Sequence, residues 1–206
     1  MTIIFLKGLA FGFILAATVG PMWVLCFRRT IEQGALAGFN SGMGIAVADS
    51  LYGAVAAFGL TAVSGVLLQH SLGIGLIGSA FLLYLGTKTL LARPMIEQTR
   101  INPTGLMKGF FSTLGLTLAN PPTILAFVAI FAGLGLVSSD YGTAALVVLG
   151  VFLGSASWWV ILAAGAGWLR GRIGPTLFRA INIVSGLSIL AFAVWHLAAV
   201  LGHTPI

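Results

Sequence analysis

Asp49 is the residue of this sequence whose position most clearly indicates a chemical role. It lies in the segment Gly44–Gly53, read Gly-Ile-Ala-Val-Ala-Asp-Ser-Leu-Tyr-Gly, in the middle of an apolar run from about residue 36 to 63. The carboxyl group must therefore lie inside a hydrophobic span, where a charge costs roughly 2.5–3.5 kcal/mol on insertion scales. Acids in such places mark substrate and proton pathways, so we expect Asp49 to bind a transported species or a proton. The alternative is a structural carboxyl group that is neutral or hydrogen-bonded to a neighbouring helix.

An aromatic residue and several others are candidates to complete the same site. Tyr52 follows Asp49 by three positions, so in a helix the two side chains share a face. The Tyr52 hydroxyl could donate a hydrogen bond to the carboxylate, or the ring could only pack. Thr18, Ser155 and Trp158 are further candidates for the lining of a cavity around Asp49.

Two proline-containing breaks interrupt apolar runs, Gly20-Pro21 and Asn120-Pro121-Pro122. Proline lacks an N–H group and clashes with the preceding turn, which frees backbone carbonyls. In a bilayer these groups need partners, so a break must face protein or a wet cavity. The helix that begins after a break offers unpaired N–H groups and a partial positive charge to an anion. We expect the breaks to bind a substrate carboxylate whose ammonium group pairs with Asp49; the alternative for each is a simple proline kink.

The composition indicates an integral membrane protein. Of the 206 residues, 59% are hydrophobic and 7% are charged, whereas soluble domains carry about 25% charged residues. The mean hydropathy is +1.09, and no polar stretch is long enough to build a soluble domain. The formal net charge of +6 does not indicate nucleic-acid binding here, because membrane proteins concentrate Lys and Arg in their cytoplasmic loops.

Enzymatic chemistry is poorly supported by the sequence. The one cysteine, Cys26, excludes an intramolecular disulfide and a Cys-x-x-Cys site. The sequence has no Gly-rich phosphate-binding loop, no Gly-x-Ser-x-Gly nucleophile motif and no cluster of metal ligands. We therefore expect no enzymatic activity, no cofactor and no metal.

Hydropathy predicts an all-α membrane protein with six transmembrane helices, because each span needs about 20 apolar residues. A short polar loop with Arg28, Arg29 and Glu32 is expected after the first span, and no stretch shows the alternation of a β-barrel. The predicted spans cover approximately residues 3–27, 36–63, 72–91, 108–137, 141–169 and 176–201.

The basic residues predict how these spans are oriented. The first, third and fifth loops contain or adjoin nearly all Lys and Arg, whereas only Lys7 lies close to the opposite side. Short loops rich in Lys and Arg stay in the cytoplasm. We therefore expect a multi-pass protein with both termini outside.

Matched positions indicate an internal repeat of three spans plus three, with halves at residues 1–91 and 108–206 joined by a cytoplasmic linker at 92–107. Lys7-Gly8 and Pro21 are followed 101 residues later by Lys108-Gly109 and Pro122, and Gly44 and Asp49 are followed 106 residues later by Gly150 and Ser155. Three is an odd number, so the two halves must enter the membrane in opposite senses. The predicted fold is an inverted repeat with broken first and fourth helices, an arrangement that supports alternating access.

The sequence resembles the LysE/RhtB family of bacterial amino-acid exporters over roughly its first two-thirds. The matching positions are Gly20-Pro21 with Arg28-Arg29 and Gly34, Gly42-x-Gly44-x-x-x-x-Asp49, Gly78 with Leu82-x-Tyr84-Leu85-x-Gly86, and Lys108-Gly109-Phe110 with Asn120-Pro121. The chain departs from the family's frequent Pro-Gly-Pro in the first span, where it has Val19-Gly20-Pro21. It also departs from the frequent Asn-Pro-Lys in the fourth, where Pro122 removes a charge.

The resemblance implies a secondary transporter of the bacterial inner membrane that exports small amino acids or close analogues, driven by the proton gradient. The expected partners are an amino-acid substrate, protons and the lipid bilayer. Gly-x-x-x-Gly segments such as Gly8–Gly12 allow close helix contact and leave a homo-oligomer open. A passive channel and a non-transporting membrane scaffold are the alternatives.

Overall fold

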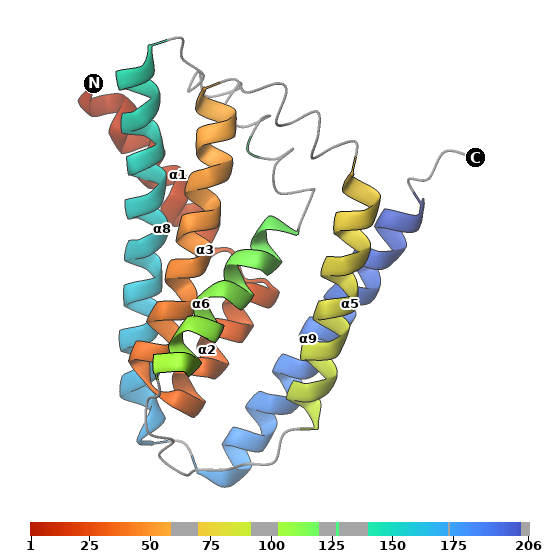
Figure 1. Ribbon diagram of the computed structural model, residues 1–206. Helices are drawn as coiled ribbons and strands as arrows, with labels where there is room; N and C mark the ends of the chain where they lie inside the picture. Colours follow the sequence, from red (N-terminus) through yellow and green to blue (C-terminus); the bar gives the residue numbers. More distant parts are fainter. Residues whose placement is uncertain (59–69, 92–102, 120–126, 128–139, 173, 203–206) are drawn as a thin grey trace.

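The computed structural model describes residues 1–58, 70–91, 103–119, 127, 140–172 and 174–202, and all regular structure within these ranges is helical (Figure 1). The predicted all-α class is confirmed for these residues. The helices are α1 (Thr2–Ala17), α2 (Pro21–Gln33), α3 (Ala35–Ala57), α5 (Ser71–Leu90), α6 (Pro103–Leu118), α8 (Tyr141–Arg170) and α9 (Pro175–Gly202).

Two of the described helices are long and apolar enough to cross a membrane alone, Tyr141–Arg170 and Thr176–Trp195 within α9. A third span results if α1 and α2, which meet at an angle of 73°, are counted together, and residues 76–90 form a shorter apolar helix. Helix α3 has 23 residues, but polar side chains such as Asn40, Ser41 and Asp49 lower its hydropathy. The full set of six spans therefore stays a prediction.

The prediction of a polar loop at Arg28, Arg29 and Glu32 is wrong, because all three residues lie in α2. The charges are compensated inside the helix: Arg28 Nη2 lies 2.6 Å from Glu32 Oε1, one turn later. The connection to α3 is the single residue Gly34, whose φ of 102° is a conformation that favours glycine.

Two further helix starts follow from local capping. Helix α6 begins at Pro103, earlier than the predicted start at Lys108, since proline is pre-organised for the first helical position. Helix α8 begins after Asp140, which accepts hydrogen bonds from the backbone N–H and the hydroxyl of Thr143 at 2.7 and 2.5 Å. These two hydrogen bonds hold the pKa of the exposed Asp140 carboxyl below its usual value.

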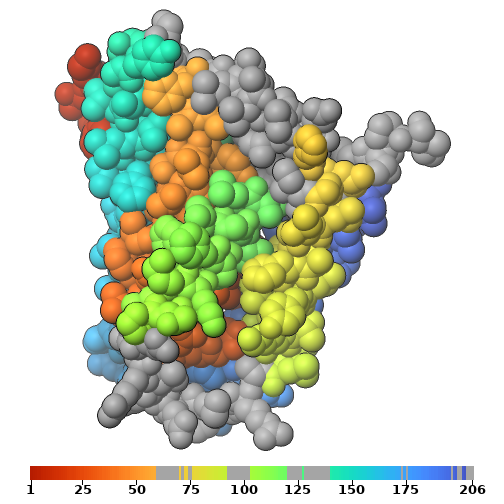
Figure 2. Space-filling model, viewed as in Figure 1, coloured from red at the N-terminus to blue at the C-terminus, as the bar shows by residue number. Residues whose placement is uncertain are grey.

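Helices α3 and α8 pack against each other, with α8 at the left edge of the view in Figure 1. Helix α6 packs on α3, and α1 packs on α8. Helices α5 and α9 form a second closely packed pair, and α2 contacts α9 of this pair as well as α3 and α8. On the face drawn in Figure 2, α6 lies between α3 and α5. The start of α1 and the end of α9 lie at the same end of the bundle (Figure 1).

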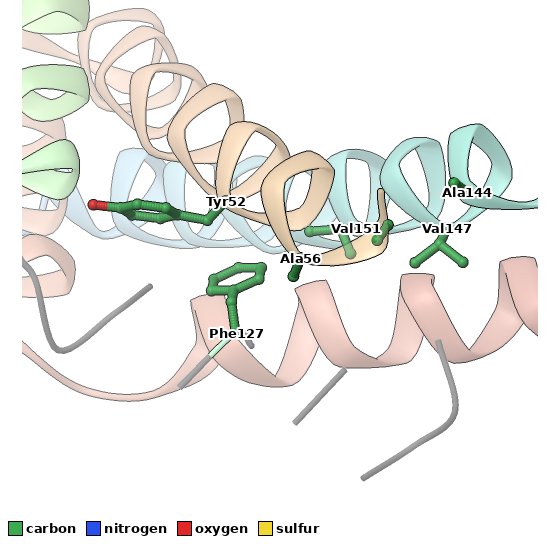
Figure 3. Close-up of a cluster of buried hydrophobic side chains, with 7 residues drawn as sticks. Tyr52, Ala56, Phe127, Ala144, Val147 and Val151 are labelled. Atoms are coloured by element: carbon green, nitrogen blue, oxygen red, sulfur yellow. The ribbon is translucent and has the colours of Figure 1, made fainter. Parts of the chain in front are cut away.

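A buried cluster holds α3 and α8 together near that end (Figure 3). Phe127 is its largest fully buried member and packs edge-on to Phe11 of α1 with ring centroids 5.1 Å apart. In Figure 3 the Tyr52 ring faces this cluster, while its hydroxyl group points away from it. The cluster therefore fixes α3, and with it the position of Asp49 one turn before Tyr52.

Small residues let α1 and α8 approach closely. A Cβ atom added at Gly12 would lie 2.2 Å from the backbone oxygen of Val151, and one added at Gly154 would lie 2.0 Å from that of Leu9. A Cβ atom added at Gly8 or Gly150 would also lie close to the opposite backbone, 2.6 Å from the Val147 oxygen and 2.5 Å from the Phe5 oxygen. Such close approach is how helices associate in lipid, where the hydrophobic effect gives little driving force.

We expect Gly12→Ala to destabilise the protein by about 1–3 kcal/mol, because the new methyl group must push backbone apart rather than a flexible side chain. The midpoint of thermal unfolding in detergent should fall. Gly115→Ala is the matched control, since a Cβ atom there meets nothing within 4 Å and alanine favours helix by up to about 1 kcal/mol over glycine. Equal midpoints of thermal unfolding for the two variants would contradict the view that Gly12 is needed for the close contact of α1 with α8.

Candidate functional site

The Asp49 carboxyl group lies where α3 crosses α8, and its residue is only 3% exposed. Its Oδ2 accepts a hydrogen bond from the Ser155 hydroxyl at 2.8 Å, and Ser155 Oγ in turn accepts one from the indole N–H of Trp159 at 3.2 Å. Ser155 is fully buried and Trp159 is 2% exposed. The three side chains form a buried chain of hydrogen bonds from Trp159 and Ser155 of α8 to Asp49 of α3.

Asp49 also borders a cavity of about 190 Å³. The cavity lies between the end of α1, the start of α2, and parts of α3, α6 and α8. Its lining residues are Leu15, Ala16, Thr18, Gly20, Pro21, Met22, Trp23, Ile45, Asp49, Leu116, Thr117 and Trp159. Asp49 is the one ionisable side chain among these, so a bound cation would find its counter-charge there.

The break between α1 and α2 forms one wall of this cavity. Gly20 is the N-cap of α2 in an extended conformation, Pro21 opens the helix, and no side chain caps it. The N–H groups of the first turn have no partner within their own helix, and Met22 and Trp23, which carry two of them, line the cavity. The indole Nε1 of Trp23 is buried and has no hydrogen-bond partner among the described residues. Uncapped donors and one carboxyl group thus border the same space.

The structure places five of the ten predicted site residues at or next to this cavity. Gly20, Pro21 and Thr18 line it, and Thr18 Oγ1 donates to the backbone oxygen of Ile14 at 3.1 Å. Ser155 does not line the cavity but bonds directly to Asp49. The predicted break at Asn120-Pro121-Pro122 lies outside the described residues.

Two predicted aromatic residues take other positions. The Tyr52 hydroxyl donates to the backbone oxygens of Leu118 at 2.9 Å and Thr117 at 3.2 Å, so it ties α3 to the last turn of α6 rather than to Asp49. Trp158 does not line the cavity; its ring packs edge-on against Phe13 at 5.5 Å. Trp159, the next residue, occupies the cavity wall instead, and its spacing of four from Ser155 was the available signal for it.

Trp23 was also missed by the sequence analysis. It follows the break by two positions, so its first-turn location in α2 was a signal for it. The described residues contain no group of three or more His, Cys, Asp or Glu side chains that could hold a metal ion.

Arg28 and Arg29 build a second polar cluster, at the opposite end of the bundle from the start of α1 and the end of α9. Arg29 donates to Ser41 Oγ of α3 at 3.0 Å, and to the Gly109 oxygen at 2.9 Å and Ser112 Oγ at 2.7 Å, both on α6. Arg29 therefore joins α2 to the pair α3 and α6, whereas the neighbouring Arg28 contacts a different pair of helices.

Arg28 reaches the α5 and α9 pair. Its Nη1 donates to Thr89 Oγ1 at 2.5 Å and its Nε donates to Asn182 Oδ1 at 3.2 Å. The two arginines thus join four helices through α2 at this end. We call Arg28, Arg29 and their partners the arginine clamp.

Comparison with known proteins decides the family. The sequence profile of the LysE type translocators matches residues 13–199. This chain belongs to that family. The resemblance predicted from the sequence motifs is confirmed, and the match extends over the last third of the chain, where the motifs were weakest.

The LysE family protein is similar to a Bacillus subtilis (strain 168) protein named "Putative amino acid efflux protein YcgF". The two are 27% identical over 197 residues, which cover 93% of this chain and 94% of the relative. No solved structure matches the chain. Membership of a family of translocators, together with the apolar helices, makes this a membrane transport protein.

Proposed function

We propose that this LysE family protein exports small amino acids or close analogues from the cytoplasm, and that Asp49 couples export to the proton gradient. The observation that carries the proposal is a buried carboxyl group at a cavity that is also lined by an uncapped helix start. The name of the Bacillus subtilis relative refers to amino acid efflux and supports the same substrate class.

The cavity suits the two charged ends of an amino acid. Asp49 offers a partner for the ammonium group, and the first turn of α2 offers N–H donors and the positive end of a helix dipole to the carboxylate. A volume of about 190 Å³ is below the roughly 300–1,000 Å³ of sites for drug-sized ligands. The substrate is therefore a small molecule.

Contacts between repeat-related positions support the inverted repeat and its six spans. Asp49 and Ser155 are 106 residues apart, equivalent in the predicted repeat, and hydrogen-bonded to each other. Residues that are equivalent and also in contact lie at a two-fold axis. Gly150 abuts Leu9 of α1, and its equivalent Gly44 abuts Phe110 of α6, the equivalent of Leu9 at an offset of 101.

The arginine clamp supports the proposed orientation. It lies where α2 ends, at the opposite end of the bundle from the start of α1 and the end of α9 (Figure 1). This is the basic end, which is cytoplasmic by the rule for Lys and Arg. We assign the protein to the bacterial inner membrane with both termini outside. We infer that the clamp holds the cytoplasmic side closed in one state of the alternating-access cycle and opens in the other.

The proton and the substrate ammonium compete for one carboxylate. When Asp49 is ionised it holds the ammonium group, and protonation from the outer side releases the amino acid there. The two species never occupy the carboxylate together, so proton entry is exchanged for substrate exit. The coupling needs no second titrating side chain.

Transport into inside-out vesicles tests the proposal. With the vesicle interior made acidic, a radiolabelled amino acid such as alanine should accumulate above its external concentration, and a protonophore should abolish the accumulation. Equilibration that ignores the gradient would support a passive channel instead. No uptake of any amino acid, with no effect of amino acids on the melting temperature, would support a non-transporting scaffold.

A further inference from the structure

A second, smaller cavity adjoins the one that contains Asp49. It has a volume of about 40 Å³ and shares Pro21, Met22 and Leu116 with the larger cavity. Its remaining lining residues are Gly78 and Leu82 of α5, Ala119 just after α6, and Phe192 of α9. None of these side chains is polar. We call this space the apolar annex.

We propose that the apolar annex receives the substrate's side chain, so that Leu82, Gly78 and Phe192 determine specificity for amino acids with short, uncharged, apolar side chains. This inference rests on the proposed function, because it assumes that the charged ends of the substrate occupy the larger cavity. Pro21 and Met22 lie on the wall that both spaces share, so a substrate held at the start of α2 is next to the annex.

Charge restricts the substrate class first. Asp49 is the one ionisable residue among the described residues that line either space. The Asp49 carboxylate already pairs with the substrate ammonium. A lysine, arginine, aspartate or glutamate side chain would therefore bring into the annex a charge that has no partner there. An unpaired charge inside a membrane protein is strongly unfavourable, which excludes these amino acids.

Size restricts it further, because the walls of the annex are tightly packed. Leu82 is 6% exposed and belongs to a buried cluster with Leu25, Leu116 and Ile189. Gly78 abuts the end of α6: a Cβ atom there would lie 2.7 Å from the backbone oxygen of Ala119. A cavity of about 40 Å³ exceeds the roughly 10–15 Å³ that one water needs by only a few fold. The annex therefore accepts side chains of a few carbon atoms.

The test compares a size series of amino acids in the vesicle assay, for the wild-type protein and for Leu82→Ala. The wild-type protein should transport alanine and valine and should discriminate against leucine, phenylalanine and lysine. Leu82→Ala enlarges the annex, so the ratio of leucine to alanine transport should rise about tenfold or more, the usual scale for a change in a hydrophobic pocket. Leu187→Ala is the matched control, since Leu187 of α9 is 53% exposed and should leave this ratio unchanged.

A second variant makes the test independent of a folding failure in the first. Leu82→Phe fills the annex, so the ratio of valine to alanine transport should fall. Each variant is first shown to elute as a single species in detergent. Two results would overturn the proposal that the annex determines specificity: unchanged transport ratios in both variants, or a wild-type preference for lysine or glutamate. Uphill export of alanine in the same assay would still support the proposed function. Failure of the wild-type protein to export any amino acid would instead overturn the proposed function itself.

Discussion

Asp49→Asn should abolish amino-acid export while the protein still folds and inserts in the membrane. Asparagine keeps the size of the side chain, and its carbonyl oxygen can still accept the Ser155 hydrogen bond. It loses the negative charge, which leaves the substrate ammonium without a partner in the cavity, and it cannot take up a proton. Because both proposed tasks of the carboxylate are lost together, transport in vesicles should fall about 100-fold or more, to background.

The matched control for this variant is Asp140→Asn, the same chemical change at an exposed acid that caps α8. Asparagine is as good an N-cap as aspartate, so this variant should export normally. Both proteins should reach the membrane in equal amounts and elute alike in detergent. Normal uphill export by Asp49→Asn would rule out the carboxylate as the coupling group.

The helices and the position of the acid could be predicted from sequence because they depend on local patterns. Long apolar runs define α8 and α9 to within a residue or two of their predicted ends, and Pro21 marks the 73° bend. The repeat offset of 106 residues makes Asp49 and Ser155 equivalent positions on the basis of sequence alone. The helix bounds and the bend are specified by residues close in sequence, whereas the pairing of Asp49 with Ser155 comes from comparing the two halves of the chain.

Other features depend on contacts that the sequence does not display. Charge next to a span favours a loop, but Arg28 and Arg29 continue α2 because four other helices supply acceptors for them. Tyr52 shares a face with Asp49, yet its hydroxyl finds free carbonyls at the end of α6. The choice of Trp159 over Trp158 for the cavity depends on how α8 is rotated against α3. Each of these outcomes is decided by a partner distant in sequence.

Arg29→Ala should open the end of the bundle that we propose is cytoplasmic, and should uncouple transport. The change removes three hydrogen bonds from a charged group, each worth about 1.5–3 kcal/mol, from contacts that join α2 to α3 and α6. The state closed on the cytoplasmic side should lose population relative to the state open there. In the vesicle assay the variant should then bind substrate but accumulate little of it against a gradient.

The chain's one cysteine reports on this opening directly. Cys26 lies on α2, one turn before Arg29, is fully buried, and packs with Ile45 of α3 and Trp159 of α8. A small maleimide should label it slowly in the wild-type protein, where α2 separates from these helices only transiently, and much faster in Arg29→Ala. Arg29→Lys should be intermediate, because lysine keeps the charge but not the forked geometry that reaches two helices.

Arg172→Ala separates loss of the clamp from loss of charge at the same end of the bundle. Arg172 is exposed and lies over the Trp168 ring at 3.6 Å from its centroid, outside the clamp, so its removal should leave Cys26 protected and accumulation unchanged. If Arg29→Ala behaves as this control does, the clamp is a static brace and the cytoplasmic gate lies elsewhere. If Cys26 becomes reactive and added substrate changes its labelling rate, α2 moves during transport. The same helix that begins at the substrate cavity then ends in the clamp, which gives the binding site a direct mechanical connection to the cytoplasmic gate.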